Sequence, residues 1–299
     1  MIAAGRGRRK QAVIWEEKVM GKALSTADIA RYERDGVFSP VPVFSATEVA
    51  YFRGKLEQQE RIQGGPMRGT LMFKTHLMFR WVDEMIRHPK VLDAVEDILG
   101  PNLLAWNSHW FIKEPNDGRY VGWHQDTTYW NLTPDDAITA WIALSPATAE
   151  SGAMKMVPGT HTREVVEHKD TWKEGAMLTR GQEIAVEVNE ADAVDVVLKP
   201  GEMSLHHHKI FHASHGNTSG DRRIGLAIRY IPTHVRQIAI SDDSAALVRG
   251  EDRFRHFNEE RRPTSDFDPI GAELQNKAAD AQRRILYAGT DRKEFRKGL

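Results

Sequence analysis

A histidine and an aspartate stand one residue apart in the segment GWHQDTTY, at positions 124 and 126. Side chains two positions apart on a β-strand point to the same face, so His124 and Asp126 can contact a single metal ion. A second histidine-rich segment, LHHHKIFHASHGN, covers residues 205–217. The first two residues alone could equally be a hydrogen-bonded pair at a strand end, but the second segment supplies the further ligand that a metal site needs.

Two histidines and one carboxylate on one side of an iron(II) ion form a facial triad, which leaves positions open for 2-oxoglutarate and dioxygen. His212 is the preferred third ligand. Arg223 follows it on what would be the next strand, where its two-pronged guanidinium could bind the far carboxylate of 2-oxoglutarate. A zinc site at His206, His207 and His208 is disfavoured, because consecutive strand residues point to opposite faces. These three are interpreted as strand residues and neighbours of the metal ligands.

Helices are indicated at both ends of the chain. Ser25 and Thr26 can cap a helix that Gly36 ends, and the sequence SATE from Ser45 is a capping box for a helix over 46–62. Apolar residues at helical spacing indicate a third helix over 88–99, followed by Gly-Pro. A last helix is expected near 270–287.

Beyond Pro101 the residue pattern changes from helical spacing to short strand-like runs. Short runs rich in β-branched and aromatic residues alternate with clusters of Gly, Pro, Asn and Asp, which is typical of an antiparallel barrel or a double-sheet jelly roll. We therefore predict a mainly β fold with flanking helices and a single domain over 23–299. Its parts are a helical segment at 23–100, a β core at 101–235 and a C-terminal cover at 236–299. Residues 1–22 are expected to be a mobile extension, and Met20 could be the natural start.

The composition is that of an ordinary globular protein, with 40% hydrophobic and 28% charged residues and a formal net charge of −1. This balance argues against broad electrostatic binding of nucleic acid or an anionic membrane. The chain contains no cysteine, which excludes disulfides, thiolate nucleophiles, iron–sulfur clusters and cysteine-ligated zinc. No signal-peptide pattern or membrane-spanning apolar run is present. We expect a cytoplasmic enzyme with a small-molecule substrate; no pattern indicates an oligomeric state.

Eight segments, taken in order, resemble the phytanoyl-CoA dioxygenase family of iron(II)- and 2-oxoglutarate-dependent oxygenases. They run from about residue 25 to 232 and read ERDGVF, HPKVLDAVEDILGP, FIKEP, WHQDTTYW, AITAWIAL, GAMKMVPGTH, LKPGE and HASHGNTSGDRR. Single segments carry little information, whereas the ordered set is specific. The resemblance implies a double-stranded β-helix (jelly-roll, cupin-like) core, with iron held by His124, Asp126 and His212.

The resemblance also implies residues around the cosubstrate. Arg223 would anchor 2-oxoglutarate, and Lys74, Trp141 and Ser214 stand at positions that line its site in relatives. Asn107 is a further candidate on the strand before the metal-binding pair. Trp141 could instead be an ordinary core residue, and Lys74 a solvated surface residue.

Candidates for the substrate side are Tyr129, Trp130, His76, His109 and Arg229. Arg229 shares strand parity with Arg223, so both could face the same interior. There Arg229 could bind an anionic group of the substrate. The alternative for Arg229 is a salt bridge at the surface.

The implied reaction couples decarboxylation of 2-oxoglutarate, to succinate and CO2, with hydroxylation of an unactivated C–H bond by O2. Halogenating relatives replace the carboxylate ligand by alanine or glycine, so Asp126 favours hydroxylation. Relatives act on acyl-CoA thioesters, amino acids and compatible solutes, organophosphonates, and terpenoid or polyketide intermediates. Near-neutral charge slightly favours a small free metabolite.

Two other functions stay open. A cupin-like metal-binding barrel without oxygenase activity would keep the histidines but has no need for Arg223. A non-catalytic binding relative of the fold would be favoured by an altered triad, and here all three ligand types are present.

Overall fold

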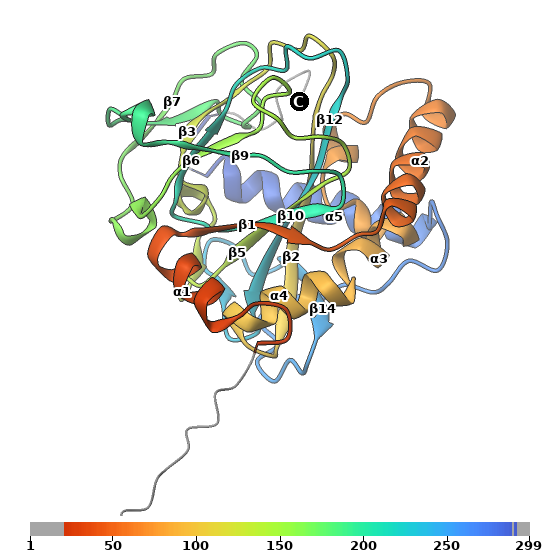
Figure 1. Cartoon of the computed structure of the whole chain (residues 1–299). Coiled ribbons are helices and arrows are strands. Elements are labelled where there is room, and N and C mark those ends of the chain that lie inside the picture. Colours follow the sequence, from red (N-terminus) through yellow and green to blue (C-terminus); the bar gives the residue numbers. More distant parts are fainter. Residues whose placement is uncertain (1–20, 289, 292–299) are drawn as a thin grey trace, which may run out of the picture.

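Two β-sheets packed face to face form the centre of the protein, whose computed structural model describes residues 21–288, 290 and 291. The predicted extension at 1–22, with Met20, lies outside the described residues except for its last two positions. In Figure 1 the smaller sheet lies at the upper left, and the helices α1 (Thr26–Asp35) and α4 (Pro89–Leu99) lie in the lower part of the view. The predicted jelly-roll architecture is confirmed.

Within the described residues the major sheet has the strand order β1–β10–β5–β12–β2–β14–β15 and the minor sheet the order β3–β11–β6–β9. The major sheet consists of β1 (Val37–Pro42), β10 (Glu202–His207), β5 (Ile138–Ala143), β12 (Arg223–Pro232), β2 (Leu103–Lys113), β14 (Ser244–Arg249) and β15 (Asn258–Glu259). The minor sheet consists of β3 (Val121–His124), β11 (Phe211–Ser214), β6 (Met154–Val157) and β9 (Val194–Val196). Two short ribbons pair β4 (Leu132–Thr133) with β13 (Arg236–Gln237) and β7 (His168–Asp170) with β8 (Gln182–Ile184).

The four predicted helices are confirmed. They are α1 (Thr26–Asp35), α2 (Ala46–Gln63), α4 (Pro89–Leu99) and α5 (Pro269–Leu286). The Ser45 hydroxyl accepts a hydrogen bond from the Glu48 amide while the Glu48 carboxylate accepts from the Ser45 amide, as a capping box requires. Gly36 ends α1 at φ 73°, a left-handed conformation that costs glycine little.

Two elements in the first hundred residues were not predicted. Helix α3 (Arg80–Ile86) is too short for its apolar spacing to stand out. Strand β1 contains Pro40 and Pro42, which weaken a strand pattern. Its place at the edge of the major sheet explains why prolines are tolerated there. Five 3-10 turns complete the described part: η1 (Gly69–Met72), η2 (Thr75–Leu77), η3 (Asp126–Tyr129), η4 (Thr160–Thr162) and η5 (Glu190–Asp192).

Strand β12 shows how the major sheet divides its two faces. Ile224, Leu226, Ile228 and Tyr230 pack in the core that the first four helices cover. The alternate residues, from Arg223 to Arg229, point to the minor sheet, where Ala227 joins a smaller core between the two sheets. The inner face is therefore polar at two positions that a purely structural strand would fill with apolar side chains.

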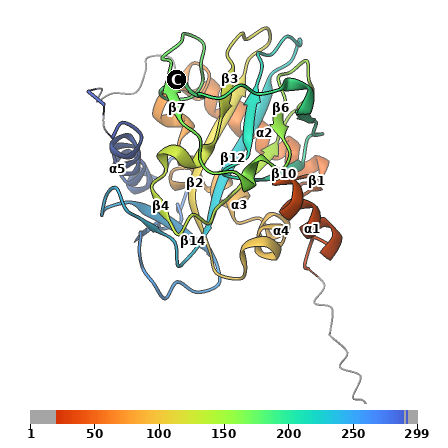
Figure 2. The same cartoon turned by 90° about the vertical axis from the view of Figure 1, so that its left-hand side faces the viewer.

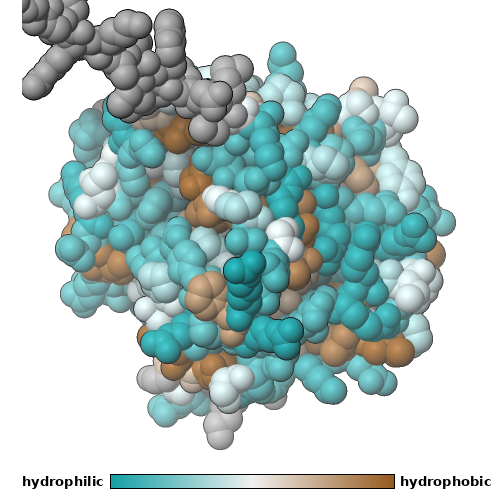
Figure 3. Space-filling model, turned by 90° about the horizontal axis from the view of Figure 1, so that it is seen from below, coloured by the Kyte–Doolittle hydropathy of each residue, from teal (hydrophilic) through white to brown (hydrophobic). Residues whose placement is uncertain are grey.

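Helix α5 lies on the opposite side of the molecule from α1, at the left of Figure 2. Among the described residues, no helix combines the length and the apolar character needed to cross a membrane. The face shown in Figure 3 is mainly hydrophilic, with apolar side chains in small scattered groups.

Candidate active site

His124 and His212 are direct partners across the antiparallel pair of β3 and β11. Their ring centroids are 4.0 Å apart. The Nδ1 atoms lie 2.9 Å from the Gly122 carbonyl oxygen and 3.0 Å from the Ile210 carbonyl oxygen. A carbonyl only accepts, so each Nδ1 carries the proton and each Nε2 lone pair is left to bind a metal.

Asp126 completes the group, although not in the way its spacing predicts. Strand β3 ends at His124 and Asp126 begins the turn η3, so the prediction that the two share a strand is wrong. The turn nevertheless brings Asp126 Oδ1 to 3.4 Å from His124 Nε2. The ligand atoms of His124, Asp126 and His212 all lie within 4.8 Å of one another. Their types and spacing fit one iron(II) ion.

The electrostatics of the triad suit a metal. Burial and the neighbouring His124 hold the pKa of His212 well below its ordinary value, so its ring is neutral. Burial acts to raise the pKa of Asp126, but a hydrogen bond from His124, when Nε2 carries a proton in the absence of metal, and the charge of Arg229 outweigh it and keep that pKa below its usual range. Both residues are thus deprotonated near neutral pH, as ligands must be.

A smaller cavity beside the triad is lined by Arg223, Trp141 and Ser214, three residues predicted for 2-oxoglutarate. The Arg223 Cζ lies 5.3 Å from the centre of the Trp141 ring. One guanidinium nitrogen donates to the Gly152 carbonyl, whereas Nε has no partner among the described residues. Burial lowers the pKa of Arg223 to about 10, so the group remains charged. A fixed, buried charge with unused donors fits a carboxylate.

Lys113, which the sequence pattern did not single out, belongs to the same end of the site. Its Nζ donates to Ser214 Oγ at 2.7 Å and to the His215 carbonyl. It is fully buried, and burial together with the charge of Arg223 lowers its pKa to about 6. The sequence does contain a signal for this position. Lys113 is separated from Asn107 and His109 by even numbers of residues on β2, so the three side chains point to the same face.

Lys74 and His76 lie elsewhere, which corrects two predictions. Lys74 is buried, and its Nζ is bound 2.6 Å from Glu260 Oε1 and 2.6 Å from the Ser244 carbonyl. His76 contacts the other oxygen of Glu260 at 2.8 Å and Ser108 Oγ at 2.7 Å. Because Glu260 draws both side chains to itself, neither lines the cavities around the triad. Lys74 is not a solvated surface residue either.

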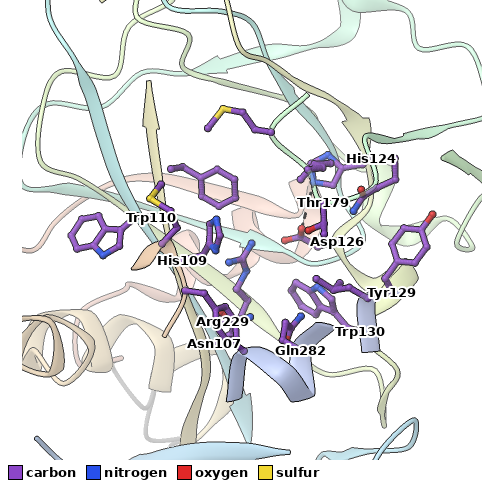
Figure 4. Close-up of a pocket in the computed structure, with 18 of the residues that line it drawn as sticks. Asn107, His109, Trp110, His124, Asp126, Tyr129, Trp130, Thr179, Arg229 and Gln282 are labelled. Carbon is purple, nitrogen blue, oxygen red and sulfur yellow. Dashed lines mark ion pairs between the residues drawn. The ribbon is translucent and has the colours of Figure 1, made fainter. Parts of the chain in front are cut away.

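A larger cavity of about 140 Å³ opens on the other side of the triad (Figure 4). It is lined by the other predicted substrate-side residues, Tyr129, Trp130, His109 and Arg229, and by Asn107. Arg223 and Arg229 were predicted to face the same interior, and both line the smaller cavity beside the triad. Ala279, Gln282 and Leu286 of α5 also line the cavity and were not foreseen, because nothing local in that helix signals a site.

The model of the family described as phytanoyl-CoA dioxygenase (PhyH) matches residues 32–225. The chain belongs to the phytanoyl-CoA dioxygenase family. The resemblance inferred from the sequence motifs is confirmed.

Two proteins that are similar to this chain are oxygenases by name. A probable alpha-ketoglutarate-dependent hypophosphite dioxygenase of Stutzerimonas stutzeri is 31% identical over 52% of this chain and 54% of its own length. The chain spans about half the length of the first curated relatives it matches. The solved structure of a non-heme monooxygenase, ThoJ, is 35% identical, with a TM-score of 0.77 over 86% of this chain and 96% of that one.

CytC3, solved with Fe(II) and alpha-ketoglutarate, is 25% identical, with a TM-score of 0.61 over 82% of this chain and 96% of that one. A solved relative of this chain thus binds iron(II) and 2-oxoglutarate, the two cofactors that the sequence predicts for the chain itself.

Proposed function

We propose that this protein is an iron(II)- and 2-oxoglutarate-dependent hydroxylase of a small metabolite. The observation that carries the proposal is the convergence of three ligands on one point, beside a buried arginine that no carboxylate pairs among the described residues. A metal-binding barrel without oxygenase activity explains the three ligands but leaves Arg223 without a purpose.

His124, Asp126 and His212 would hold the iron on one side and leave the other side open. The bound iron, with 2-oxoglutarate and O2, supplies the oxidation that converts a C–H bond into C–OH and yields succinate and CO2. Arg223 fixes the far carboxylate of 2-oxoglutarate, and Trp141 holds the guanidinium in place. The aromatic walls of the larger cavity orient the substrate and exclude water.

Hydroxylation is favoured over halogenation because a carboxylate, Asp126, fills the third ligand position. A halide ligand would need that space. The distinction is tested by supplying chloride or bromide to the active enzyme and analysing the product by mass spectrometry. A halogenated product would contradict the assignment.

The cofactor site is tested without any substrate. We would prepare the protein without oxygen, titrate it with iron(II) and 2-oxoglutarate, and follow the weak visible charge-transfer band that iron(II)–2-oxoglutarate complexes show. The band is expected in wild type, absent in His212→Ala and shifted to much higher 2-oxoglutarate concentrations in Arg223→Ala. No band in wild type, with tight zinc binding instead, would point to the non-oxygenase barrel.

A further inference from the structure

Arg229 lies at the wall of the larger cavity, where the charge of Asp126 acts on it without forming an ion pair. It makes no hydrogen bond or ion pair with any described residue, and its Nε is buried without a partner. The guanidinium Cζ lies 5.7 Å from the centre of the Phe111 ring and 5.8 Å from that of Trp130. Aromatic faces hold a guanidinium in position but accept none of its N–H groups, so its donors stay available.

The residues around Arg229 complete a polar recess. Asn107 is its direct partner across the β2–β12 pair, and the buried Asn107 Oδ1 has no hydrogen-bond partner among the described residues. Burial and the charge of Arg229 lower the pKa of His109 to about 3, so His109 is a neutral neighbour. Figure 4 shows the guanidinium between the His109 ring and the Asp126 carboxylate, with Asn107 below it.

The other charged groups that face this recess are already paired or assigned, which leaves Arg229 to bind a ligand. Asp126 is the nearest carboxylate, but it is within 4 Å of His124 and not of Arg229, and a bound metal would use its charge. Arg119 also lines the cavity, yet it is paired with Asp117 at 2.6 Å. Arg223 is the anchor proposed for 2-oxoglutarate. In the described part of the cavity wall, Arg229 is the cation that a ligand would have to neutralise.

The rest of the cavity limits what that ligand can be. Met72, Phe73, Leu178 and Leu286 contribute an apolar wall. A cavity of about 150 Å³ accommodates benzene, so the volume of about 140 Å³ suits a compact molecule. We infer that the guanidinium of Arg229, with the amide N–H groups of Asn107 beside it, forms an anion subsite, and that the substrate is a small organic acid. Its oxyanion binds the guanidinium while its carbon skeleton lies against the apolar wall, beside His124 and Asp126.

This inference rests on the proposed function and names the substrate class of the same site. A carboxylate and a phosphonate share the chemistry that a guanidinium fork recognises. The amide of the same acid has the same shape but no charge. Comparing an acid with its own amide therefore isolates the contribution of the anion.

The test uses the full chain loaded with iron(II) and 2-oxoglutarate under anaerobic conditions. The probes are a panel of small straight-chain, branched and aryl-substituted carboxylic acids, each with its primary amide and its phosphonate counterpart, measured by titration calorimetry. The best acids or phosphonates are expected to bind at least about tenfold more tightly than their amides, because a bidentate, charge-assisted pair replaces a neutral contact. Whichever anion binds more tightly identifies the oxyanion that the subsite takes.

Arg229→Gln is expected to abolish the preference for the anion while leaving amide binding and the affinity for 2-oxoglutarate unchanged. Arg229→Lys keeps the charge and should keep part of the preference, which serves if the glutamine variant folds poorly. Arg119→Gln is the matched control, because it removes a cation from the same cavity that already has its carboxylate. Its preference should equal that of wild type.

Different results would overturn the proposed function and the anion subsite. If wild type gives no charge-transfer band with 2-oxoglutarate, the proposed function fails. If the band is present but no acid or phosphonate binds better than its amide, or if Arg119→Gln and not Arg229→Gln removes the preference, only the anion subsite is overturned.

Discussion

Two groups of buried charge lie on opposite faces of the major sheet, on either side of the layer that β2 and β12 form. On the outer face, Lys74 and His76 share the carboxylate of Glu260, and Ser108 accepts or donates to His76. On the inner face, Arg223 and Arg229 each have a buried Nε that finds no partner in the part of the chain that the structure describes. The outer group is complete within the protein. The inner group leaves donors unused.

The difference separates structural charge from functional charge. Burying an ion is costly, and a protein recovers most of that cost by pairing it, as Glu260 does for Lys74. Leaving two guanidinium groups unpaired lowers stability and is explained only if ligands pair them later. The lysine that resembled a cosubstrate residue by sequence is thus a fold residue.

Glu260→Gln should give the largest effect, because it leaves the buried charge of Lys74 without its counter-ion. We expect a loss of about 3–5 kcal/mol in the free energy of unfolding, measured by urea denaturation. The double variant Lys74→Met/Glu260→Gln removes both charges and should regain most of the loss. A cost close to zero for Glu260→Gln would remove the distinction between the two groups.

The matched change on the inner face is Arg223→Met. It removes an unpaired charge, so the metal-free protein should be as stable as wild type or more stable, while 2-oxoglutarate affinity falls. A destabilisation comparable to that of Glu260→Gln would show that Arg223 is also a fold residue.

Gly225→Ala should have an intermediate effect on stability and should also affect the 2-oxoglutarate site, through the ring of Trp141. A Cβ at Gly225 would lie 1.9 Å from the Trp141 ring, so the ring has to move. The clash should cost about 1–3 kcal/mol of stability. Because Trp141 packs against Arg223, 2-oxoglutarate should also bind less tightly.

Thermal unfolding and the charge-transfer titration measure the two consequences of that change. Gly54→Ala is the control, because Gly54 is exposed on α2 and nothing lies near its Cβ position. That alanine should stabilise the helix slightly. If Gly225→Ala binds 2-oxoglutarate as wild type does, Trp141 has no part in positioning Arg223.

The triad and Arg223 were predictable because their evidence is local: a short spacing, a histidine cluster and an arginine on the next strand. Arg229 followed from parity on the same strand. The turn at Asp126 could not be predicted, because nothing in HQDTTY distinguishes a strand that continues from one that ends at His124. The four capped helices were predictable from cap residues for the same local reason.

The destination of Lys74 depends on a residue 186 positions away, and no spacing rule reaches Glu260. Residues expected as a C-terminal cover also contribute β14 to the major sheet and α5 to the cavity wall. Such long-range partners are set by packing. Lys113 differs from these residues, because its even spacing from Asn107 and His109 on β2 is a local signal that predicts the same face.

Lys113 gives the smallest predicted effect and one that depends on pH. Without ligand its pKa is about 6, so near pH 8 it is almost entirely neutral. A dianion bound at the neighbouring Arg223 favours the charged form and raises that pKa, so 2-oxoglutarate should bind with uptake of a proton. Affinity should therefore increase, on the order of tenfold, as the pH falls from about 8 to about 6.

Anaerobic calorimetry in two buffers of different ionisation enthalpy measures the proton directly. Lys113→Met should bind 2-oxoglutarate without proton uptake and with an affinity that no longer depends on pH in this range. If wild type takes up no proton, or binds more tightly as the pH rises, the neighbouring Lys113 does not act on the cosubstrate. Arg223 then faces the carboxylate alone, and Lys113 is a buried amine on the inner face of β2 that the ligands do not explain.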